Sequence, residues 1–314
     1  MSLPRLHRFY VSGAAVVLAA AGLALYASPT PDGRVTDASG RPLPGVHVTA
    51  TRPDGVVAYS VVTDGNGEYA FESIPAGSYT LTASRIGYVG ARKEGFNPTD
   101  GAATDLQLSI EPEVIHQAPS SAFLSALPDG LEKRAFILDC TGCHQLDQRI
   151  ALPGSAPRSH SAWASATQYM LSFAGASSPF PIMSPSRNAQ ATATFLSTHL
   201  NRVPAYQAPS PMTGADAAFT TTEYRVPGWG DLPHDLMPDS QGRIIITGMM
   251  TQQMYVLDPA SSTYSTVPTP ANGARALDIG PDGTWYVALG QGNQVAAYDP
   301  RTQQWRSWSI GMYP

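Results

Sequence analysis

The chain of 314 residues is long enough for about two domains or more, and its formal net charge of −5 gives no basic surface for nucleic acid. Charged residues make up only 14% of the chain, whereas 28 glycines and 28 prolines predict many tight turns between short strands. The two cysteines exclude a disulfide-rich scaffold and any zinc site built from three or four cysteines.

Residues 1–28 predict an export signal or an N-terminal membrane anchor. Arg5 and Arg8 precede an uncharged run from Phe9 to Ala27 that is rich in Ala, Val and Leu. The run is long enough to cross a bilayer, but cleavage after Ala27 would leave a bulky leucine close before the cut, so a cleaved signal and a retained anchor both stay open. We expect the rest of the chain to be periplasmic or otherwise extracytoplasmic, with the membrane contacted only through this segment, which would anchor it to the inner membrane if retained.

Residues 31–112 alternate strand-like runs with turn signals, as a small β-sandwich requires. Val46, Val48 and Ala50 alternate with polar residues, which gives a strand one buried face. The runs DASG at 37–40 and DGNG at 64–67 predict turns between such strands.

The string GRVTDASGRPLPGVHVTA and the later VVTDGNGEYAFESIPAGSYTLTASRIGY resemble the carboxypeptidase regulatory-like domain. This resemblance implies a transthyretin-like sandwich of about seven strands. Such domains serve as structural modules or contact carbohydrates and proteins. The resemblance therefore implies a glycan or protein ligand for the segment and no catalytic residues.

Both cysteines lie in the run CTGCH at 140–144, and a C-x-x-C-H pattern is typical of covalent haem attachment. Thiols one helical turn apart can each form a thioether bond with a haem vinyl group, and the next residue presents an imidazole to iron. A thioredoxin-like redox pair would need a surrounding βαβ pattern, and a zinc site would need two further ligands. A chance match also stays open. We predict one covalent haem c per chain, held by Cys140, Cys143 and His144.

Segment 120–203 around this motif carries helix signals. Asp129 is placed to cap a helix whose apolar positions Leu131, Ala135 and Leu138 lead into the motif. The pair Ser184-Pro185 predicts the start of a last helix. The apolar face of that helix consists of Ala189, Ala193, Leu196 and Leu200. A helix that carries the motif and a last helix packed across it resemble the small all-α fold of monohaem c-type cytochromes.

The resemblance to these cytochromes implies a methionine from the loop before the last helix as the second axial ligand. Met183 lies in that loop, and Met170 is its rival, although Met170 shares with Trp163 an apolar stripe typical of core packing. The second axial position could instead be filled by His160 or His199, or stay open. Thioether ligation favours electron transfer, whereas an open position permits ligand binding or peroxidase-like chemistry.

Residues 204–218 are rich in Pro, Ala and Ser and predict a linker, and segment 219–314 after them contains a repeat. The Asp-Pro pair at Asp258 recurs at Asp299, a period of about 41 residues that suits a four-stranded propeller blade. The pattern of Pro-His, Pro-Asp-x-Gly and Tyr-x-Asp-Pro resembles propellers of the virginiamycin B lyase family. His234 occupies the Pro-His position, for which we expect a structural role, and the resemblance supplies no catalytic residue.

Two repeats are too few to close a propeller ring, which has about four to eight blades. We therefore expect a partial β-propeller of about two blades, from a longer protein in preference to blades that associate between chains. The predicted fold class is multidomain and mostly β: a β-sandwich, a small all-α cytochrome c domain and the partial propeller.

The leading functional expectation is an exported monohaem cytochrome module that exchanges electrons with a redox partner protein. The propeller would bind a substrate or a partner. Two further hypotheses are a lyase-like enzyme with an accessory haem, and a cell-envelope protein that binds carbohydrate or protein. An electron-transfer protein is favoured over a self-sufficient enzyme, and no nucleic acid partner is expected.

Overall fold

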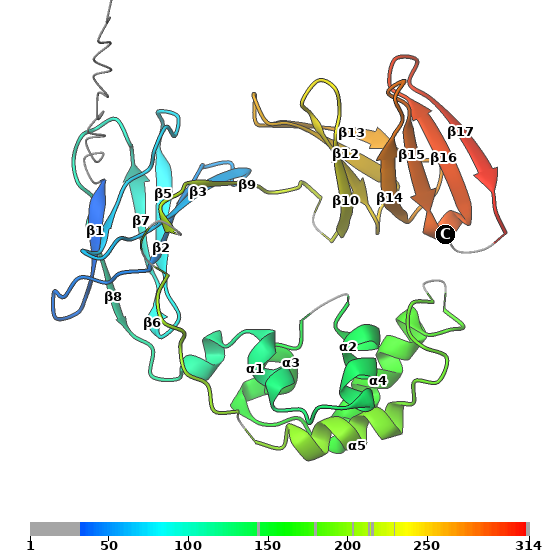
Figure 1. Cartoon of the computed structure of the whole chain (residues 1–314), viewed down its shortest axis with the longest axis horizontal. Coiled ribbons are helices and arrows are strands. Elements are labelled where there is room, and N and C mark those ends of the chain that lie inside the picture. Colours follow the sequence, from blue (N-terminus) through cyan, green and yellow to red (C-terminus); the bar gives the residue numbers. More distant parts are fainter. Residues whose placement is uncertain are drawn as a thin grey trace, which may run out of the picture. The chain divides into compact units, whose positions relative to one another are not determined.

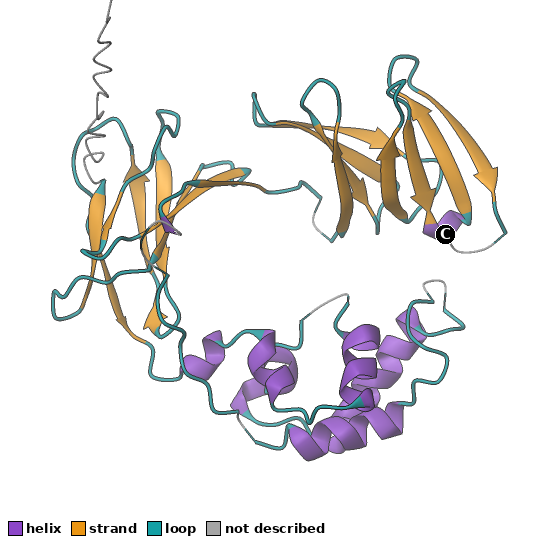
Figure 2. Cartoon of the chain, viewed as in Figure 1, coloured by secondary structure: helices purple, strands orange, loops and turns teal. Residues whose placement is uncertain are grey.

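The computed structural model describes residues 32–142, 145–178, 181–202, 204–212, 214, 217–228 and 230–311. Within these ranges the chain is a mostly β, multidomain protein with one helical segment (Figure 1), and its strands form four sheets without a closed barrel. In Figure 2 the α-helices form one group, and a short 3₁₀ turn is also drawn in the C-terminal part. The predicted export signal or anchor lies outside the described residues, as do Cys143 and His144. No helix in the described ranges is long and apolar enough to cross a membrane.

The first two sheets contain the strands between residues 33 and 110, with one later strand added at an edge. The sheet orders are β4-β1-β8-β6 and β7-β5-β2-β3-β9. Their strands are β1 (Gly33–Asp37), β2 (His47–Thr51), β3 (Val57–Val62), β4 (Glu68–Tyr69), β5 (Tyr79–Ser84), β6 (Tyr88–Val89), β7 (Ala91–Phe96), β8 (Leu106–Ile110) and β9 (Thr221–Tyr224). Only the β1–β8 pair is parallel among these described strands.

Alternation of apolar and polar residues builds the core between these two sheets. Val46, Val48 and Ala50 are fully buried, which confirms the predicted strand face. They share one buried cluster with Val35 and Leu108 of the other sheet. Since successive side chains of a strand point to opposite faces, the polar residues between them stay outside, and the two sheets form a β-sandwich.

Both predicted turns are confirmed, and an aspartate organises each of them. The Asp37 carboxylate accepts the N–H groups of Ser39 and Arg41, and the Asp64 carboxylate accepts that of Glu68. Such side-chain-to-backbone bonds favour a turn over a continued strand.

The extended segment 88–96 changes sheets at Gly90. On one side of Gly90, β6 pairs with β8, and on the other side β7 pairs with β5. A Cβ atom at Gly90 would lie 3.0 Å from the Ala83 carbonyl oxygen, so glycine allows the backbones to approach closely here. The sandwich region therefore has eight short strands where about seven were expected, because one segment serves two sheets.

The helical segment follows the sandwich. It contains the 3₁₀ turns η1 (Val114–Gln117) and η2 (Pro153–Ser155) and the helices α1 (Ser120–Ser125), α2 (Leu131–Cys140), α3 (Gln148–Ala151), α4 (His160–Ala174) and α5 (Ala189–His199). The predicted apolar face of the last helix is confirmed, because Ala193, Leu196 and Leu200 are almost fully buried. They share a cluster with Phe136 of α2 and Trp163 of α4, so these three helices have a common core.

The predicted cap of α2 is wrong. Gly130 occupies the N-cap position without a side-chain hydrogen bond. The Asp129 carboxylate instead accepts a hydrogen bond of 2.9 Å from Lys133 Nζ. This ion pair between side chains four residues apart competes successfully with the backbone N–H groups for the carboxylate.

The predicted apolar face of α2 is also wrong. Leu131 and Leu138 are 85% and 71% exposed, whereas Phe136 is only 4% exposed. Phe136 and Cys140 are one helical turn apart, and both contribute to buried clusters. Tertiary packing therefore turns the aromatic side chain inward, a choice that apolar spacing alone does not resolve.

The last helix starts later than predicted. Asn188, not Ser184, is its N-cap, and the Asn188 side chain accepts the N–H groups of Gln190 and Ala191. Residues 184–187 form a turn closed by the Arg187 N–H and the Ser184 carbonyl. Ser184 cannot cap the helix because it belongs to that earlier turn.

Two four-stranded antiparallel sheets follow in the C-terminal part. The first contains β10 (Pro233–Pro238), β11 (Ile244–Gly248), β12 (Gln253–Asp258) and β13 (Thr263–Pro268). The second contains β14 (Ala274–Ile279), β15 (Trp285–Leu289), β16 (Gln294–Asp299) and β17 (Gln304–Ser309), with the short turn η4 (Gly290–Gly292). In each sheet the strands are neighbours in chain order.

The strand registers agree with the period found in the sequence. Leu236 lies opposite Ile246 in the first sheet, and Leu277 lies opposite Val287 in the second. The spacing from Leu236 to Leu277 equals that from Asp258 to Asp299. The two sheets are therefore two copies of one structural unit.

The Pro-Asp pairs of the two repeats are not at equivalent positions. Relative to the strands, Asp282 lies later in its turn than Asp239 does. Each carboxylate nevertheless accepts the backbone N–H just before the second strand, from Arg243 in one repeat and Thr284 in the other. Both turns thus contain the same hydrogen bond, although the aspartate that accepts it has moved.

A hydrogen-bond network joins the two sheets where β10 faces β14. The Asp235 carboxylate accepts the Leu277 N–H (2.9 Å). Thr247, which is fully buried, accepts the Asp235 N–H through Oγ1 and donates to the Arg275 carbonyl (2.9 Å). Buried apolar side chains from both sheets pack beside this network.

We predict that Asp235→Ala and Thr247→Val each weaken the contact between these sheets by about 1–3 kcal/mol, because each leaves a buried partner unpaired. Hydrogen exchange of the Leu277 amide measures this as about a five- to 150-fold loss of protection. The double variant should lose less than the sum, since both residues belong to one network. Thr266→Val, on exposed β13, is the matched control, and equal effects in all three variants would contradict the prediction.

Candidate functional site

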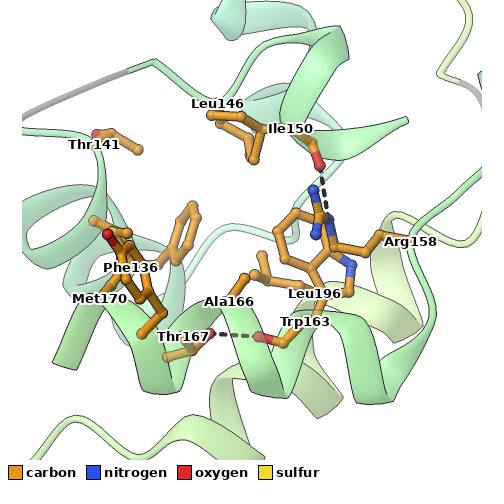
Figure 3. Close-up of a pocket in the computed structure, with 12 residues that line it drawn as sticks. Phe136, Thr141, Leu146, Ile150, Arg158, Trp163, Ala166, Thr167, Met170 and Leu196 are labelled. Carbon is orange, nitrogen blue, oxygen red and sulfur yellow. Dashed lines mark hydrogen bonds between the residues drawn. The ribbon is translucent and has the colours of Figure 1, made fainter. Parts of the chain in front are cut away.

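A cavity of about 230 Å³ lies within the helical segment (Figure 3). Cys140 is one of the residues that line it. Its volume is somewhat below the range of about 300–1,000 Å³ that is usual for cofactor and small-molecule sites. Mostly apolar side chains line it, from α2, α4, α5 and the residues between α2 and α4, and they include Phe136, Leu146, Ile150, Ala166 and Leu196. Such a lining suits a largely apolar ligand.

Cys140 lies at the C-terminal end of α2, where the Thr141 N–H still bonds the Ile137 carbonyl and closes the last turn. Its thiol lines the cavity together with Phe136, one turn earlier. Burial raises the pKa of the Cys140 thiol to about 11, so the thiol is protonated at neutral pH. The structure thus places one of the predicted attachment residues on the cavity wall, while Cys143 and His144 lie outside the described residues.

Trp163 and Arg158 form the polar end of the cavity. Trp163 is 3% exposed, and no described group accepts a hydrogen bond from its indole Nε1. The Arg158 guanidinium carbon lies 5.2 Å from the centre of the Trp163 ring, and Arg158 Nε donates to the Ile150 carbonyl (3.0 Å). Figure 3 shows Phe136 and Met170 at the other end of the cavity.

The start of α4 fixes these two groups. Ser159 caps the helix by accepting the Ala162 N–H, so Arg158 directly precedes the cap and Trp163 follows in the first turns. One turn later, Thr167 donates to the Trp163 carbonyl (2.9 Å). An indole N–H and a guanidinium are both donors without acceptor capacity, and together they favour a carboxylate.

The two candidate methionines lie in one apolar cluster. Met183 is 4% exposed and shares this cluster with Cys140 and Met170. Met170 lines the cavity, whereas Met183 is not among the lining residues. The structure therefore brings both methionines close to Cys140 and leaves their roles as ligands a prediction.

The candidate histidine ligands lie elsewhere. His160 is exposed and lies 3.2 Å from the Thr194 hydroxyl, and the His199 ring packs against Phe195. Neither lines the cavity. In the C-terminal part, His234 lies 3.4 Å from the Arg275 guanidinium, and burial together with that charge lowers its pKa.

Sequence patterns do not reveal the polar end of the cavity. They mark Trp163 only as a member of the apolar stripe that contains Met170. No periodic signal marks Arg158, because it precedes the helix. Only the fold shows that the Trp163 indole N–H is buried without an acceptor among the described residues. A buried donor of this kind needs an acceptor.

Comparison with known proteins identifies one part of the chain. Residues 32–111 match the carboxypeptidase regulatory-like domain, which confirms that part of the sequence analysis. A search of curated proteins finds no match to the chain.

Two solved structures show limited similarity. One is the extracellular domain of a protein described as a one-component system from B. thetaiotaomicron, with 17% identity and a TM-score of 0.22, over 25% of this chain and 11% of that chain. The other is a protein from Lactobacillus plantarum, with 22% identity and a TM-score of 0.23, over 31% of this chain and 33% of that chain. The matches thus span about a tenth and a third of those proteins.

We predict that the haem-free Cys143→Ser variant, in which Cys140 is the remaining cysteine, is alkylated slowly by iodoacetamide. Because the thiolate is the nucleophile and its pKa is about 11, the rate should keep rising about tenfold per pH unit between about pH 8 and pH 10. In urea, where burial is lost, the same profile should level off near the ordinary cysteine pKa of about 8.5. A native profile that levels off there too would contradict the prediction.

Proposed function

We propose that this chain is an exported monohaem c-type cytochrome module that transfers electrons. One haem c would be attached through Cys140 and Cys143, with His144 as an axial iron ligand. The observation that supports this best is that Cys140 and Trp163 line one cavity, and that the buried indole N–H of Trp163 has no acceptor among the described residues. We also propose that residues 120–203 have the small all-α fold of such cytochromes.

The chemistry of the described lining residues supports this proposal. The apolar lining suits a flat macrocycle, and the donors of Trp163 and Arg158 suit the carboxylates at the macrocycle edge. Cys140 lies on the wall as a thioether bond requires. When bound, haem supplies one-electron iron chemistry.

The surrounding side chains would set the conditions for that chemistry. Phe136 and Leu196 are buried core residues that line the cavity, and they would exclude water from a bound haem. Exclusion of water and ligation by a methionine thioether both favour electron transfer over oxygen chemistry. We propose Met183 as the thioether ligand, with Met170 as its rival.

The other parts of the chain would provide location and partners. The predicted signal or anchor at 1–28 would place haem attachment outside the cytoplasm, and a redox partner protein would exchange electrons with the haem. We propose that residues 219–314, beyond the linker 204–218, form two blades of a lyase-like propeller that binds a partner or substrate. The support is two matching four-stranded sheets with a shared buried cluster. For the sandwich we propose a glycan or protein ligand.

Production of the full chain together with a haem-attachment system tests the proposal. We expect a mass increase of one haem, a pyridine haemochrome spectrum typical of c-type haem, and reversible reduction. Cys140→Ala should lose one thioether bond, which shifts the α-band of that spectrum. Protein without covalent haem under these conditions would overturn the proposal.

We further predict that Trp163→Phe affects the haem-loaded chain more than the haem-free chain. In the haem-free chain the substitution removes an unsatisfied donor, which offsets part of the cost of the smaller ring. In the haem-loaded chain it also removes a hydrogen bond to a carboxylate, for an additional loss of about 1.5–3 kcal/mol. Chemical denaturation followed by helical circular dichroism measures the difference.

Tyr206→Phe is the matched control for this comparison, because Tyr206 packs against the same core and does not line the cavity. Its effect on the free energy of unfolding should be the same with and without haem. Equal losses for Trp163→Phe in both forms would show that the indole N–H does not contact the haem.

A further inference from the structure

Arg187 is the most deeply buried cation of the ion pairs among the described residues, with 5% of its side chain exposed. Its Nε donates to Asp139 Oδ2 (2.8 Å), and its Nη1 donates to Glu132 Oε1 (2.7 Å) and to the Thr192 hydroxyl (3.2 Å). Asp139 and Glu132 belong to α2, and Thr192 belongs to α5. One guanidinium therefore joins two helices and the loop between α4 and α5.

Asp139 has a second contact that reaches the same loop. Its Oδ1 accepts the Ser184 N–H (3.2 Å), while its Oδ2 accepts Arg187 Nε. Only 11% of the Asp139 side chain is exposed. The carboxylate is thus held by partners on both sides of the turn 184–187, and it fixes that turn against α2.

These contacts lie directly beside the residues of the proposed haem site. Asp139 immediately precedes Cys140, and Ser184 immediately follows Met183. The Met183 N–H is itself bonded to the Ala174 carbonyl at the end of α4 (2.9 Å). Two consecutive N–H groups, of Met183 and Ser184, are therefore anchored, one to α4 and one to α2.

The chemistry of the pair favours a geometric role over a purely stabilising one. A buried ion pair is often no more stabilising than well-packed apolar side chains, because both charges lose their hydration. A buried ion pair does, however, fix geometry, because the planar guanidinium holds its hydrogen-bond acceptors at set positions. A loop that must present one side chain at a set distance from α2 benefits from such contacts.

We propose that the Asp139–Arg187 pair holds the loop that carries Met183 against α2, and so positions Met183, the thioether ligand proposed above, relative to Cys140. This inference rests on the proposed function. Arg187 and Asp139 act here as positioning residues, because they act through the loop and do not line the cavity. Met170, by contrast, is fixed by the backbone of α4 and needs no such support.

The test uses the full, haem-loaded chain and the variants Arg187→Gln and Asp139→Asn, with Met183→Leu as the reference for a lost ligand. The readouts are covalent haem content, the charge-transfer band from thioether to ferric iron, and the reduction potential. We expect full covalent haem in each variant, at least a threefold loss of the band, and a potential lowered toward that of Met183→Leu. Arg187→Lys keeps the charge without the guanidinium plane and should recover part of the band.

Added imidazole gives a second readout that a merely structural role would not change. A loosely held Met183 competes less well for the iron, so both variants should bind imidazole at least tenfold more tightly than the unaltered chain. Arg149→Gln is the matched control, because it removes an exposed ion pair of the same segment, with Asp147, and leaves Arg187 and Asp139 intact. It should change neither the band nor the affinity for imidazole.

The outcomes separate this inference from the proposed function. Absence of covalent haem from the unaltered chain would overturn both. Intact covalent haem with an unchanged band and imidazole affinity in Arg187→Gln and Asp139→Asn would overturn this inference alone. The inference alone would also be overturned if Met170→Leu loses the charge-transfer band and Met183→Leu keeps it. Failure of both pair variants to fold would show a role in stability only and would also overturn it.

Discussion

The helical segment is built around a buried hydrogen-bond donor, the Trp163 indole N–H, for which the described residues supply no acceptor. Trp163 is packed into the core shared by α2, α4 and α5, yet no described group accepts its indole N–H. An unsatisfied buried donor costs about 1–3 kcal/mol, which is a large fraction of the stability of a small domain. Trp163 and Arg158 both line the adjacent cavity, and we propose that a carboxylate bound there accepts hydrogen bonds from both groups.

The same segment shows how a few polar contacts can place apolar residues. Cys140, Met170 and Met183 share a cluster, but apolar packing is non-directional and would tolerate several arrangements of a methionine-bearing loop. The Asp139–Arg187 pair and the bonds of consecutive N–H groups restrict that loop. Hydrogen bonds between charged groups therefore set the position of the loop, whereas burial of apolar side chains supplies most of the free energy that stabilises the core.

The C-terminal sheets and the sandwich use simpler rules, and sequence patterns predicted them better. Alternation identified the buried positions Val46, Val48 and Ala50, and aspartates and glycines identified the turns. A period in the Asp-Pro pairs identified two equivalent sheets. These signals are local, because each strand face and each turn is determined by residues a few positions apart. Asp282 shows the limit of such local signals. The turn needs a carboxylate that accepts a backbone N–H, but the aspartate can occupy more than one position in the turn.

By itself the sequence determined the sandwich strands, the matching pair of C-terminal sheets, the buried face of α5 and the motif that predicts haem attachment. It did not determine the start of α5 or the buried face of α2, because Ser184 and Leu131 satisfy the local rules as well as Asn188 and Phe136 do. Only the tertiary structure decided those positions, since the choice depends on partners that lie far away in the chain. Tertiary structure alone also decided that Trp163 lies beside Arg158 at a cavity and that Asp139 pairs with Arg187. These contacts depend on desolvation and charge pairing, which arise only once the helices have packed.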